Sequence, residues 1–375
     1  MSEQYFATVA RGLEGLAAQE LETLGAETVQ TAFCGVSFAG DRTLLYRVNL
    51  WARLPFRVLV KLHEFPCHDA NDLYQGIQQI DWESYITPDH TLAVDATGKN
   101  RQLNHTHFTA LKVKDAIVDQ QQNALGERSS VDTEQPDVRV NVHIDQDHCT
   151  VSLDSSGSSL HRRGYRPAVG LAPLKESLAA ALIEMTGWQP DIPFLDPLCG
   201  SGTLPLEASM KALNIAPGLF RDQFGFETWP DFDVELWDDL LQEAEDNQKT
   251  GLEGVIVGCD RNPEVIRQAR ANALNCGVGH LVKFTQTELA DVEAPADHGI
   301  LLCNPPYGER LGGDEDLGAF YKLLGNVLKQ RFKGWTAFVL SGNKELASTI
   351  GLKSSQRFPV NNGSIPCQLM KYELY

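Results

Sequence analysis

Hydrophobic positions in the C-terminal half of the chain follow two alternating patterns. Short apolar runs, such as VIVGC at 255–259 and ILLC at 300–303, are typical of buried strands. Segments with apolar residues at helical spacing lie between such runs, at 205–213, 263–275 and 316–332. Strands that alternate with helices of about 10 to 15 residues predict a mostly parallel, doubly wound α/β sheet.

The N-terminal half has shorter and more mixed elements. One helix is predicted before Gly25, with apolar residues at Leu13, Leu16, Ala17, Leu21 and Leu24. Residues 41–66 indicate a helix followed by a strand, and short helices and strands alternate from 71 to 150. This half is therefore predicted to be α+β. The segment SSGSSLHRRGYRPAVG at 155–170 has the composition of a connector between the two halves.

Length and composition indicate a globular protein of two or three domains. The chain has 375 residues, of which 42% are hydrophobic, so it can bury a large core. No run approaches the roughly 18 apolar residues of a membrane helix, and the first residues lack a basic flank before an apolar segment. We expect a soluble, cytoplasmic protein that has no membrane partner. The sequence indicates no obligate protein partner either.

The eight cysteines are scattered without a CxxC pair, and several lie inside apolar runs. This pattern favours reduced, buried thiols over disulfides. The ligand spacing of a zinc site is missing, so no metal is predicted.

The charge distribution is more informative than the formal net charge of −18, which by itself argues against a nucleic-acid partner. Residues 222–247 carry ten acids and no Lys or Arg, so over half of the imbalance lies in one segment. Two other windows are free of acids. The window at 96–114 contains Lys99, Arg101, Lys112 and Lys114 with His105 and His107, and the window at 155–175 contains Arg162, Arg163 and Arg166 with His161 and Lys175. These Lys and Arg residues are candidate RNA contacts, although each window also suits an ordinary solvated face.

A glycine-rich turn, DPLCGSGT, follows one predicted strand and opens a helix. Glycines at such a turn let a ligand approach the backbone at the carboxyl end of the sheet. The candidate cofactor contacts here are Asp196, Pro197, Cys199, Gly200, Gly202 and Thr203. The turn alone also suits a dinucleotide enzyme or a plain tight turn.

Acids follow the next two predicted strands. Asp260 can accept the two hydroxyls of a ribose, or it can cap the helix that starts near Pro263, and both roles can coexist with Asn262. Glu288 or Asp291 can meet the amino group of an adenine; we favour Glu288, although both also suit a surface loop. A dinucleotide fingerprint needs a third glycine and an acid about 20 residues further on, so NAD is a minor alternative.

The fourth predicted strand ends in Asn304, Pro305, Pro306 and Tyr307. The prolines make this bend stiff and extended. The side-chain oxygen of Asn304 and the carbonyl of Pro305 can accept both hydrogens of a planar amino group, while Tyr307 stacks on its ring. These two acceptors favour a pyramidal nitrogen whose lone pair faces an electrophile. The catalytic candidates are thus Asn304, Pro305 and Tyr307, and Asn304 also borders the cofactor. A turn with a capping Asn is the alternative.

These motifs together carry a resemblance. The glycine-rich turn, Asp260 and NPPY resemble class I S-adenosylmethionine-dependent methyltransferases that act on planar amino groups. The segments LHRRGYR, APLKESLAAAL, DPLCGSGTLPLEA and NPPYGERLG resemble the THUMP-domain RNA methyltransferases that form N2-methylguanosine, and among them the RlmL type, which methylates bacterial large-subunit ribosomal RNA. The resemblance covers most of the chain, in the N-terminal half by layout more than by motif. Related sequences usually have Asp where this chain has Glu288.

The resemblance implies a domain order and a cofactor. It implies a ferredoxin-like segment at 1–65, a THUMP domain at 66–155, a linker at 156–170 and a Rossmann-like methyltransferase domain at 171–375. The first two would bind structured RNA, and S-adenosylmethionine would lie across the strand ends near Asp196, Gly200, Asp260 and Glu288. The segment at 215–232 looks like an insertion that the family often carries.

We therefore expect an enzyme that forms N2-methylguanosine in 23S ribosomal RNA. Four alternatives stay open: a transfer-RNA guanine-N2 methyltransferase, an N6-adenine DNA methyltransferase, a glutamine-N5 protein methyltransferase and a non-catalytic RNA-binding factor.

Overall fold

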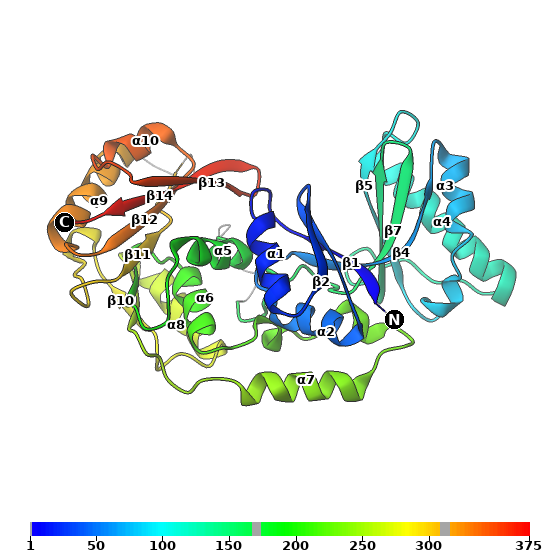
Figure 1. Ribbon diagram of the computed structural model, residues 1–375, viewed down its shortest axis with the longest axis horizontal. Helices are drawn as coiled ribbons and strands as arrows, with labels where there is room; N and C mark the ends of the chain where they lie inside the picture. Colours follow the sequence, from blue (N-terminus) through cyan, green and yellow to red (C-terminus); the bar gives the residue numbers. More distant parts are fainter. Residues whose placement is uncertain (1, 167–173, 308–315) are drawn as a thin grey trace. The chain divides into compact units, whose positions relative to one another are not determined.

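The computed structural model describes residues 2–166, 174–307 and 316–375 (Figure 1). These residues form two compact units. The N-terminal unit comprises the chain as far as Val9, Ala17–Leu160 and Arg221–Leu241, and the C-terminal unit comprises Ala10–Leu16, His161–Phe220 and Gln242–Tyr375.

One mixed sheet organises the N-terminal unit, with the strand order β2-β3-β1-β4-β7-β6-β5 among the described residues. Its strands are β1 (Glu3–Thr8), β2 (Glu27–Ala32), β3 (Gly35–Gly40), β4 (Arg57–Pro66), β5 (Leu92–Lys99), β6 (Val138–Asp145) and β7 (His148–Asp154). Strand β5 pairs in parallel with β6, while β4 pairs antiparallel with both β1 and β7. The long strand β4 therefore joins two lobes of one sheet: a first lobe with β1, β2 and β3, and a second lobe with β5, β6 and β7.

The second lobe packs two helices on one side of its strands (Figure 1). The helices of this unit are α1 (Glu14–Thr23), α2 (Arg42–Trp51), α3 (Ala70–Ile77), η1 (Trp82–Ser84) and α4 (Thr106–Leu125). Strand β6 reads VRVNVHID, and its alternation buries Val140 and Val142 in one core with Ile77 of α3 and Ile117 of α4. The polar residues of β6 are left on the open face of the sheet.

The acidic segment has an apolar side that packs on the N-terminal unit. It contains η3 (Gly225–Thr228) and much of α7 (Val234–Asp246), and η2 (Pro217–Phe220) precedes it. The ring of Phe226 stacks on Tyr46 with centroids 4.3 Å apart, and Trp237 meets Phe226 edge-on. The guanidinium of Arg221 donates to the backbone oxygen of Ser156 at 2.9 Å. All the acids of 222–247 except Glu227 are exposed. The segment is thus an amphipathic element rather than a free acidic loop.

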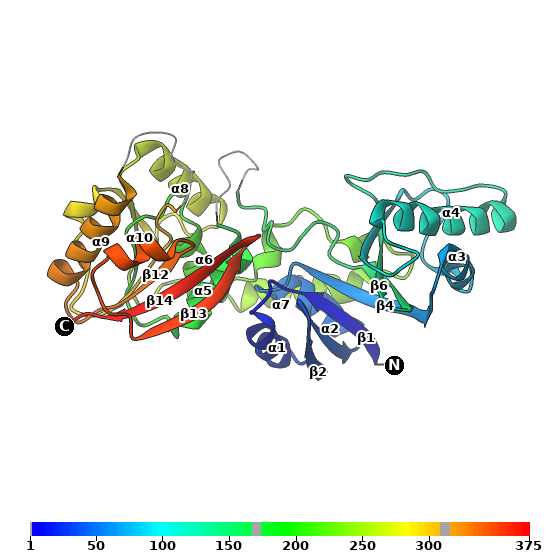
Figure 2. The same ribbon diagram turned by 90° about the horizontal axis from the view of Figure 1, so that it is seen from above.

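The C-terminal unit contains a second sheet, with the order β10-β9-β8-β11-β12-β14-β13 among the described residues. Its strands are β8 (Phe194–Asp196), β9 (Ile256–Asp260), β10 (Lys283–Gln286), β11 (Ile300–Cys303), β12 (Thr336–Ser341), β13 (Gln356–Asn362) and β14 (Ile365–Glu373). Strands β8 to β12 pair in parallel, whereas β13 and β14 form an antiparallel hairpin at the edge (Figure 2). This arrangement confirms the predicted mostly parallel α/β fold.

The helices predicted at 205–213, 263–275 and 316–332 are observed as α6 (Thr203–Ala212), α8 (Pro263–Asn275) and α9 (Leu317–Arg331). The unit also contains α5 (Glu176–Thr186), η4 (Leu289–Asp291) and α10 (Lys344–Thr349). The chain proceeds from β8 outward to β9 and β10, and then returns to the other side of β8 as β11. The direction of winding therefore reverses between β8 and β11. Ligands of doubly wound sheets bind at such a reversal.

The predicted linker is packed rather than free where it is described. Ser155 and Ser156 are buried, and the backbone N–H of Leu160 donates to Phe56 O at 2.7 Å. Arg163 and Tyr165 are also buried. Residues 167–170 lie outside the described residues.

The burial of the cysteines and the length of the helices bear on two of the predictions from composition. All eight cysteines lie in the described ranges, where seven are buried and none forms a disulfide. Within those same ranges, every helix is too short or too polar to cross a lipid bilayer.

Phe226→Ala should destabilise the N-terminal unit, because it removes the ring that stacks on Tyr46. We expect a loss of about 3–5 kcal/mol in the free energy of unfolding, measured by urea denaturation. The exposed control Glu235→Gln should unfold like the wild type. Equal midpoints for the two variants would show that the segment does not pack as described.

Candidate active site

Three adjacent parallel strands bring the predicted site residues to one edge of the sheet. Asp196 is the last residue of β8, Asp260 is the last residue of β9, and Asn304 directly follows β11. In the register, Asp196 pairs with Gly258, and Leu195 pairs with Leu301. Because carboxyl ends of parallel strands share one edge, these side chains gather where the winding reverses.

The glycine-rich turn is joined to the next strand by a direct hydrogen bond. The backbone N–H of Gly200 donates to Oδ2 of Asp260 at 3.0 Å. Gly200 has φ +52°, and a Cβ there would meet no atom of the described residues within 4 Å. Gly202 differs, since a Cβ would lie 2.9 Å from the Phe284 ring and 3.1 Å from Ala269. Gly202 is thus needed for packing, whereas Gly200 leaves room for a ligand.

Most side chains of the turn point into the protein. Asp196 is only 2% exposed, and its Oδ1 accepts the N–H of Leu198 at 3.0 Å. Burial raises the pKa of Asp196 well above its usual value, and the charge of Asp260 adds to this. Pro197, Cys199, Gly202 and Thr203 are buried too. Contacts from this turn to a ligand would therefore come mainly from its backbone, and the role of each residue stays a prediction.

Asp260 is half-buried and does not cap the following helix. Its Oδ1 accepts the N–H of Asn262 at 2.9 Å, and Asn262 itself caps α8 by accepting the N–H of Glu264 at 2.9 Å. The capping alternative for Asp260 is therefore wrong. The carboxylate instead fixes the turn and keeps a partly exposed position at the strand end, as a ribose contact requires.

Glu288 lies near Asp260 along the sheet edge. The N–H of Thr287 donates to the backbone oxygen of Asp260 at 3.0 Å, so Glu288 follows immediately. Glu288 is exposed and occupies the N-cap position of η4 without a capping hydrogen bond. Asp291, the other candidate, is exposed as well. The geometry is compatible with either acid as the adenine contact.

The NPPY segment contains a buried acceptor without a donor. Oδ1 of Asn304 is shielded from solvent and has no hydrogen-bond partner among the residues that the structure describes. Leaving a buried acceptor unpaired costs about 1–3 kcal/mol, so this atom is suited to a ligand N–H. Tyr307 is 7% exposed, and its hydroxyl accepts Nδ2–H of Asn362 at 2.7 Å. The sequence did not indicate this role of Asn362.

The arginines of the connector hold carboxylates inside the C-terminal unit. Arg163 is 1% exposed, and its Nε lies 3.5 Å from Oε1 of the fully buried Glu207. Arg166 pairs with Glu176 and donates to Oγ1 of Thr203 at 2.9 Å. The prediction that Arg163 contacts RNA is therefore wrong, because its guanidinium is buried inside the protein, whereas Arg166 is half-buried and its predicted RNA contact stays a prediction. The sequence signal for this pairing is Glu207, an acid inside the apolar helix segment LPLEASM, because a buried carboxylate needs a cation as its partner.

The basic window at 96–114 is exposed only in part. Lys99, Arg101, His105 and His107 are exposed. Nζ of Lys112 lies over the ring of Tyr74, 4.6 Å from its centroid, and Lys114 pairs with Asp115. Phe108, which lies between these basic residues in the sequence and was not among the predicted RNA contacts, is 49% exposed. Arg162 of the second window is exposed as well.

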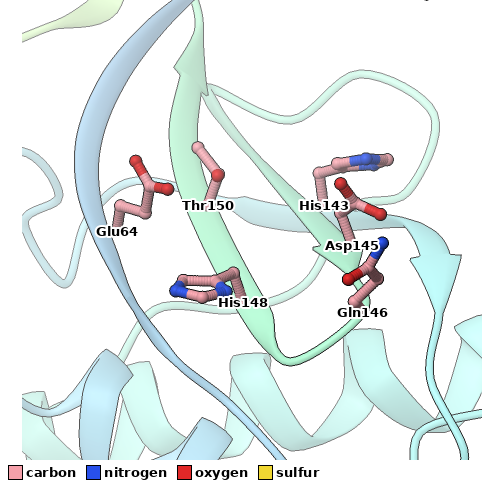
Figure 3. A pocket seen from close by; sticks show the side chains of 6 residues that line it. All are labelled: Glu64, His143, Asp145, Gln146, His148 and Thr150. Atoms are coloured by element: carbon pink, nitrogen blue, oxygen red, sulfur yellow. The ribbon is translucent and has the colours of Figure 1, made fainter.

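A polar hollow of about 350 Å³ opens on the second lobe (Figure 3). It is lined by Glu64 of β4, His143 and Asp145 of β6, Gln146, and His148 and Thr150 of β7. The described residues contain no group of three or more His, Cys, Asp or Glu that could hold a metal. The carboxylates make the hollow a poor phosphate site, so we assign it no ligand.

Comparison with known proteins identifies the family. The family described as "RMKL-like, methyltransferase domain" matches residues 163–371, which is more than half of the chain. The chain belongs to this family. The THUMP domain matches residues 67–154, and the RlmL ferredoxin-like domain matches residues 4–59. The predicted family and the predicted domain types are thereby confirmed, while the bounds at 65, 155 and 170 stay predictions.

Three known proteins are similar to this chain. A candidate RNA methyltransferase of Synechocystis sp., slr0064, is 58% identical over 99% of this chain and 97% of its own length. The ribosomal RNA large subunit methyltransferase K/L of Syntrophotalea carbinolica is 44% identical over 99% of this chain. This chain spans about half of that relative, 53% of its length. The crystal structure of SMU.472, a candidate methyltransferase complexed with SAH, is 31% identical with a TM-score of 0.88, and the match covers 100% of this chain and 98% of that one.

Arg163→Ala should destabilise the C-terminal unit, because Glu207 would stay buried without its cation. We expect a loss of about 3–5 kcal/mol in the free energy of unfolding, measured by urea denaturation. Arg162→Ala is the matched control at an exposed neighbour, with a change below about 0.5 kcal/mol. If Arg163→Ala kept wild-type stability and lost RNA binding instead, the original prediction for Arg163 would be restored.

Proposed function

We propose that this RMKL-like methyltransferase transfers a methyl group from S-adenosylmethionine to the N2 amino group of guanine in 23S ribosomal RNA. The observation that carries the proposal is the buried Oδ1 of Asn304, to which no described residue donates a hydrogen bond, at the point where the winding of the sheet reverses. The assignment of the Syntrophotalea relative as a ribosomal RNA methyltransferase supports ribosomal RNA as the substrate.

The residues at the strand ends fit S-adenosylmethionine, whose product SAH is bound in the related SMU.472 structure. The open side of Gly200 lets a ligand reach the backbone of the turn. In this proposal the half-buried Asp260 carboxylate accepts the ribose hydroxyls, and the exposed Glu288 accepts the adenine amino group. When bound, the cofactor supplies an electrophilic methyl group on a sulfonium.

Residues of the NPPY segment activate the guanine amino group by holding it in a fixed position. A guanine flipped out of its RNA stack places N2 between Oδ1 of Asn304 and the carbonyl of Pro305. Two acceptors direct both hydrogens and thereby localise the nitrogen lone pair, which is otherwise delocalised into the ring. Tyr307 borders the ring of the base. Positioning of this kind supplies much of the rate in a single displacement, and no side chain has to act as a nucleophile. The displacement would release SAH, and the methylated nitrogen would then lose one of its two protons.

Asn304→Ala should lower turnover by about 100-fold, because it removes one of the two acceptors. Its affinity for S-adenosylmethionine in calorimetry should stay near that of the wild type. Asp260→Ala should instead weaken that affinity by about 10-fold or more. Near-wild-type methyl transfer by Asn304→Ala would refute the mechanism.

The substrate is tested by mass spectrometry of ribosomal RNA, transfer RNA and DNA from a deletion strain complemented with the wild type or with Asn304→Ala. The proposal requires that one N2-methylguanosine is lost from 23S ribosomal RNA and is restored by the wild type only. Loss from transfer RNA, or loss of N6-methyladenine from DNA, would instead support the corresponding alternative.

Lys99, Arg101 and Phe108 form a candidate RNA surface of exposed residues. Replacing both Lys99 and Arg101 with Ala should weaken binding of structured RNA and lower the slope of log K against log salt by about 1.4–1.8. Phe108→Ala should weaken binding without changing the slope, since stacking on a base is not ionic.

The control for this surface is Lys112→Ala, because Lys112 contacts Tyr74 and should contribute less. Fluorescence anisotropy at several salt concentrations measures both quantities. An unchanged slope in the Lys99 and Arg101 variant would mean that this window is an ordinary solvated face.

A further inference from the structure

The hydroxyl of Tyr307 is bonded by two residues of the β13–β14 hairpin, far from NPPY in the sequence. Nδ2 of Asn362 donates to the hydroxyl at 2.7 Å, and Sγ of Cys367 lies 3.5 Å away as a second donor. Asn362 is the last residue of β13 and pairs with Ile365 across the turn. The aromatic ring is therefore attached at its outer end to the antiparallel edge of the sheet.

A glycine restricts the same ring from the side. A Cβ at Gly342 would lie 2.9 Å from both Cδ2 and Cε2 of Tyr307, and 3.0 Å from Cγ2 of Ile365. The ring thus occupies the space that a side chain at 342 would need. The hydroxyl bond sets the direction of the ring axis, and the close backbone at 342 limits rotation about that axis.

The two ends of the NPPY segment are consequently held in different ways. The prolines restrain the backbone torsions, and the hydroxyl bond restrains the side chain of Tyr307. An aromatic face for a base would be equally available from Phe, which has no hydroxyl. The hydroxyl therefore serves orientation rather than stacking.

We propose that Asn362 is a positioning residue for methyl transfer, which keeps Tyr307 and the acceptors of Asn304 and Pro305 in one fixed arrangement. This inference rests on the proposed function of the NPPY segment. It assigns part of the active-site geometry to the C-terminal hairpin.

The adjacent Asn361 provides a matched control on the same strand. Its Nδ2 donates to the backbone oxygen of Arg11 at 3.4 Å and does not contact Tyr307. Successive side chains of a strand point to opposite faces, so the two asparagines are alike in chemistry and strand position but differ in direction.

A double-mutant cycle on methyl transfer to ribosomal RNA from the deletion strain tests the inference. Asn362→Ala and Tyr307→Phe should each lower kcat by about 5- to 10-fold, with KM for RNA, affinity for S-adenosylmethionine and Tm near wild type. The double variant should be no slower than Tyr307→Phe, because loss of the hydroxyl already removes the bond from Asn362, along with the contact of Cys367. Asn361→Ala should match the wild type.

Three outcomes would overturn the inference. The first is a wild-type kcat for Asn362→Ala, and the second is that the rate losses of the single variants multiply in the double variant. The third is that Asn362→Ala lowers kcat together with the affinity for S-adenosylmethionine and Tm.

A second measurement separates this inference from the proposed function. In protein labelled with ¹³C at the tyrosine rings, the Tyr307 signal is identified by its absence in Tyr307→Phe. That signal should shift in Asn362→Ala and stay in place in Asn361→Ala. If the wild type methylated no ribosomal RNA, the proposed function would fail, but the ring signal would still decide whether Asn362 orients Tyr307. An unchanged signal in Asn362→Ala would refute this orienting role.

Discussion

Parallel pairing of β8 with both β9 and β11 is the constraint on which the rest of the C-terminal unit depends. It places three chain segments, widely separated in sequence, at the same edge of one sheet. The Asp260 carboxylate then ties the glycine-rich turn to the neighbouring strand through the Gly200 amide. Without that register, the turn, the acid and the NPPY bend would be three unrelated loops.

Buried charged side chains lie behind the carboxyl edge of this sheet. Asp196 ends β8 inside the protein, where burial raises its pKa, and the N–H of Leu198 is its hydrogen-bond donor. Arg163 faces Glu207 on α6, and Arg166 links Glu176 of α5 to Thr203 at the start of α6. A buried ion pair adds little net stability, but loss of one partner is costly. These pairs therefore hold the connector and the two helices in one defined arrangement.

The acidic segment shows how composition can conceal amphipathic packing. Its exposed acids dominate the charge count, whereas a few aromatic side chains determine where it lies. The ring of Phe226 and the side chain of Trp237 attach it to the N-terminal unit, although in sequence it lies between α6 and β9 of the C-terminal unit. Aromatic burial outweighs solvated charge here, because acids on the outer face lose no hydration.

The sequence by itself determined the alternation of strands and helices, the glycine-rich turn, Asp260 and the NPPY bend, because periodicity and backbone chemistry are local properties. It could not distinguish Arg163, which is buried, from Arg162, which is exposed, because burial depends on what the fold places opposite each side chain. It likewise did not reveal Asn362 behind Tyr307 or the free side of Gly200. Only the tertiary structure decided these contacts, because the pairing of distant strands brings their partners together.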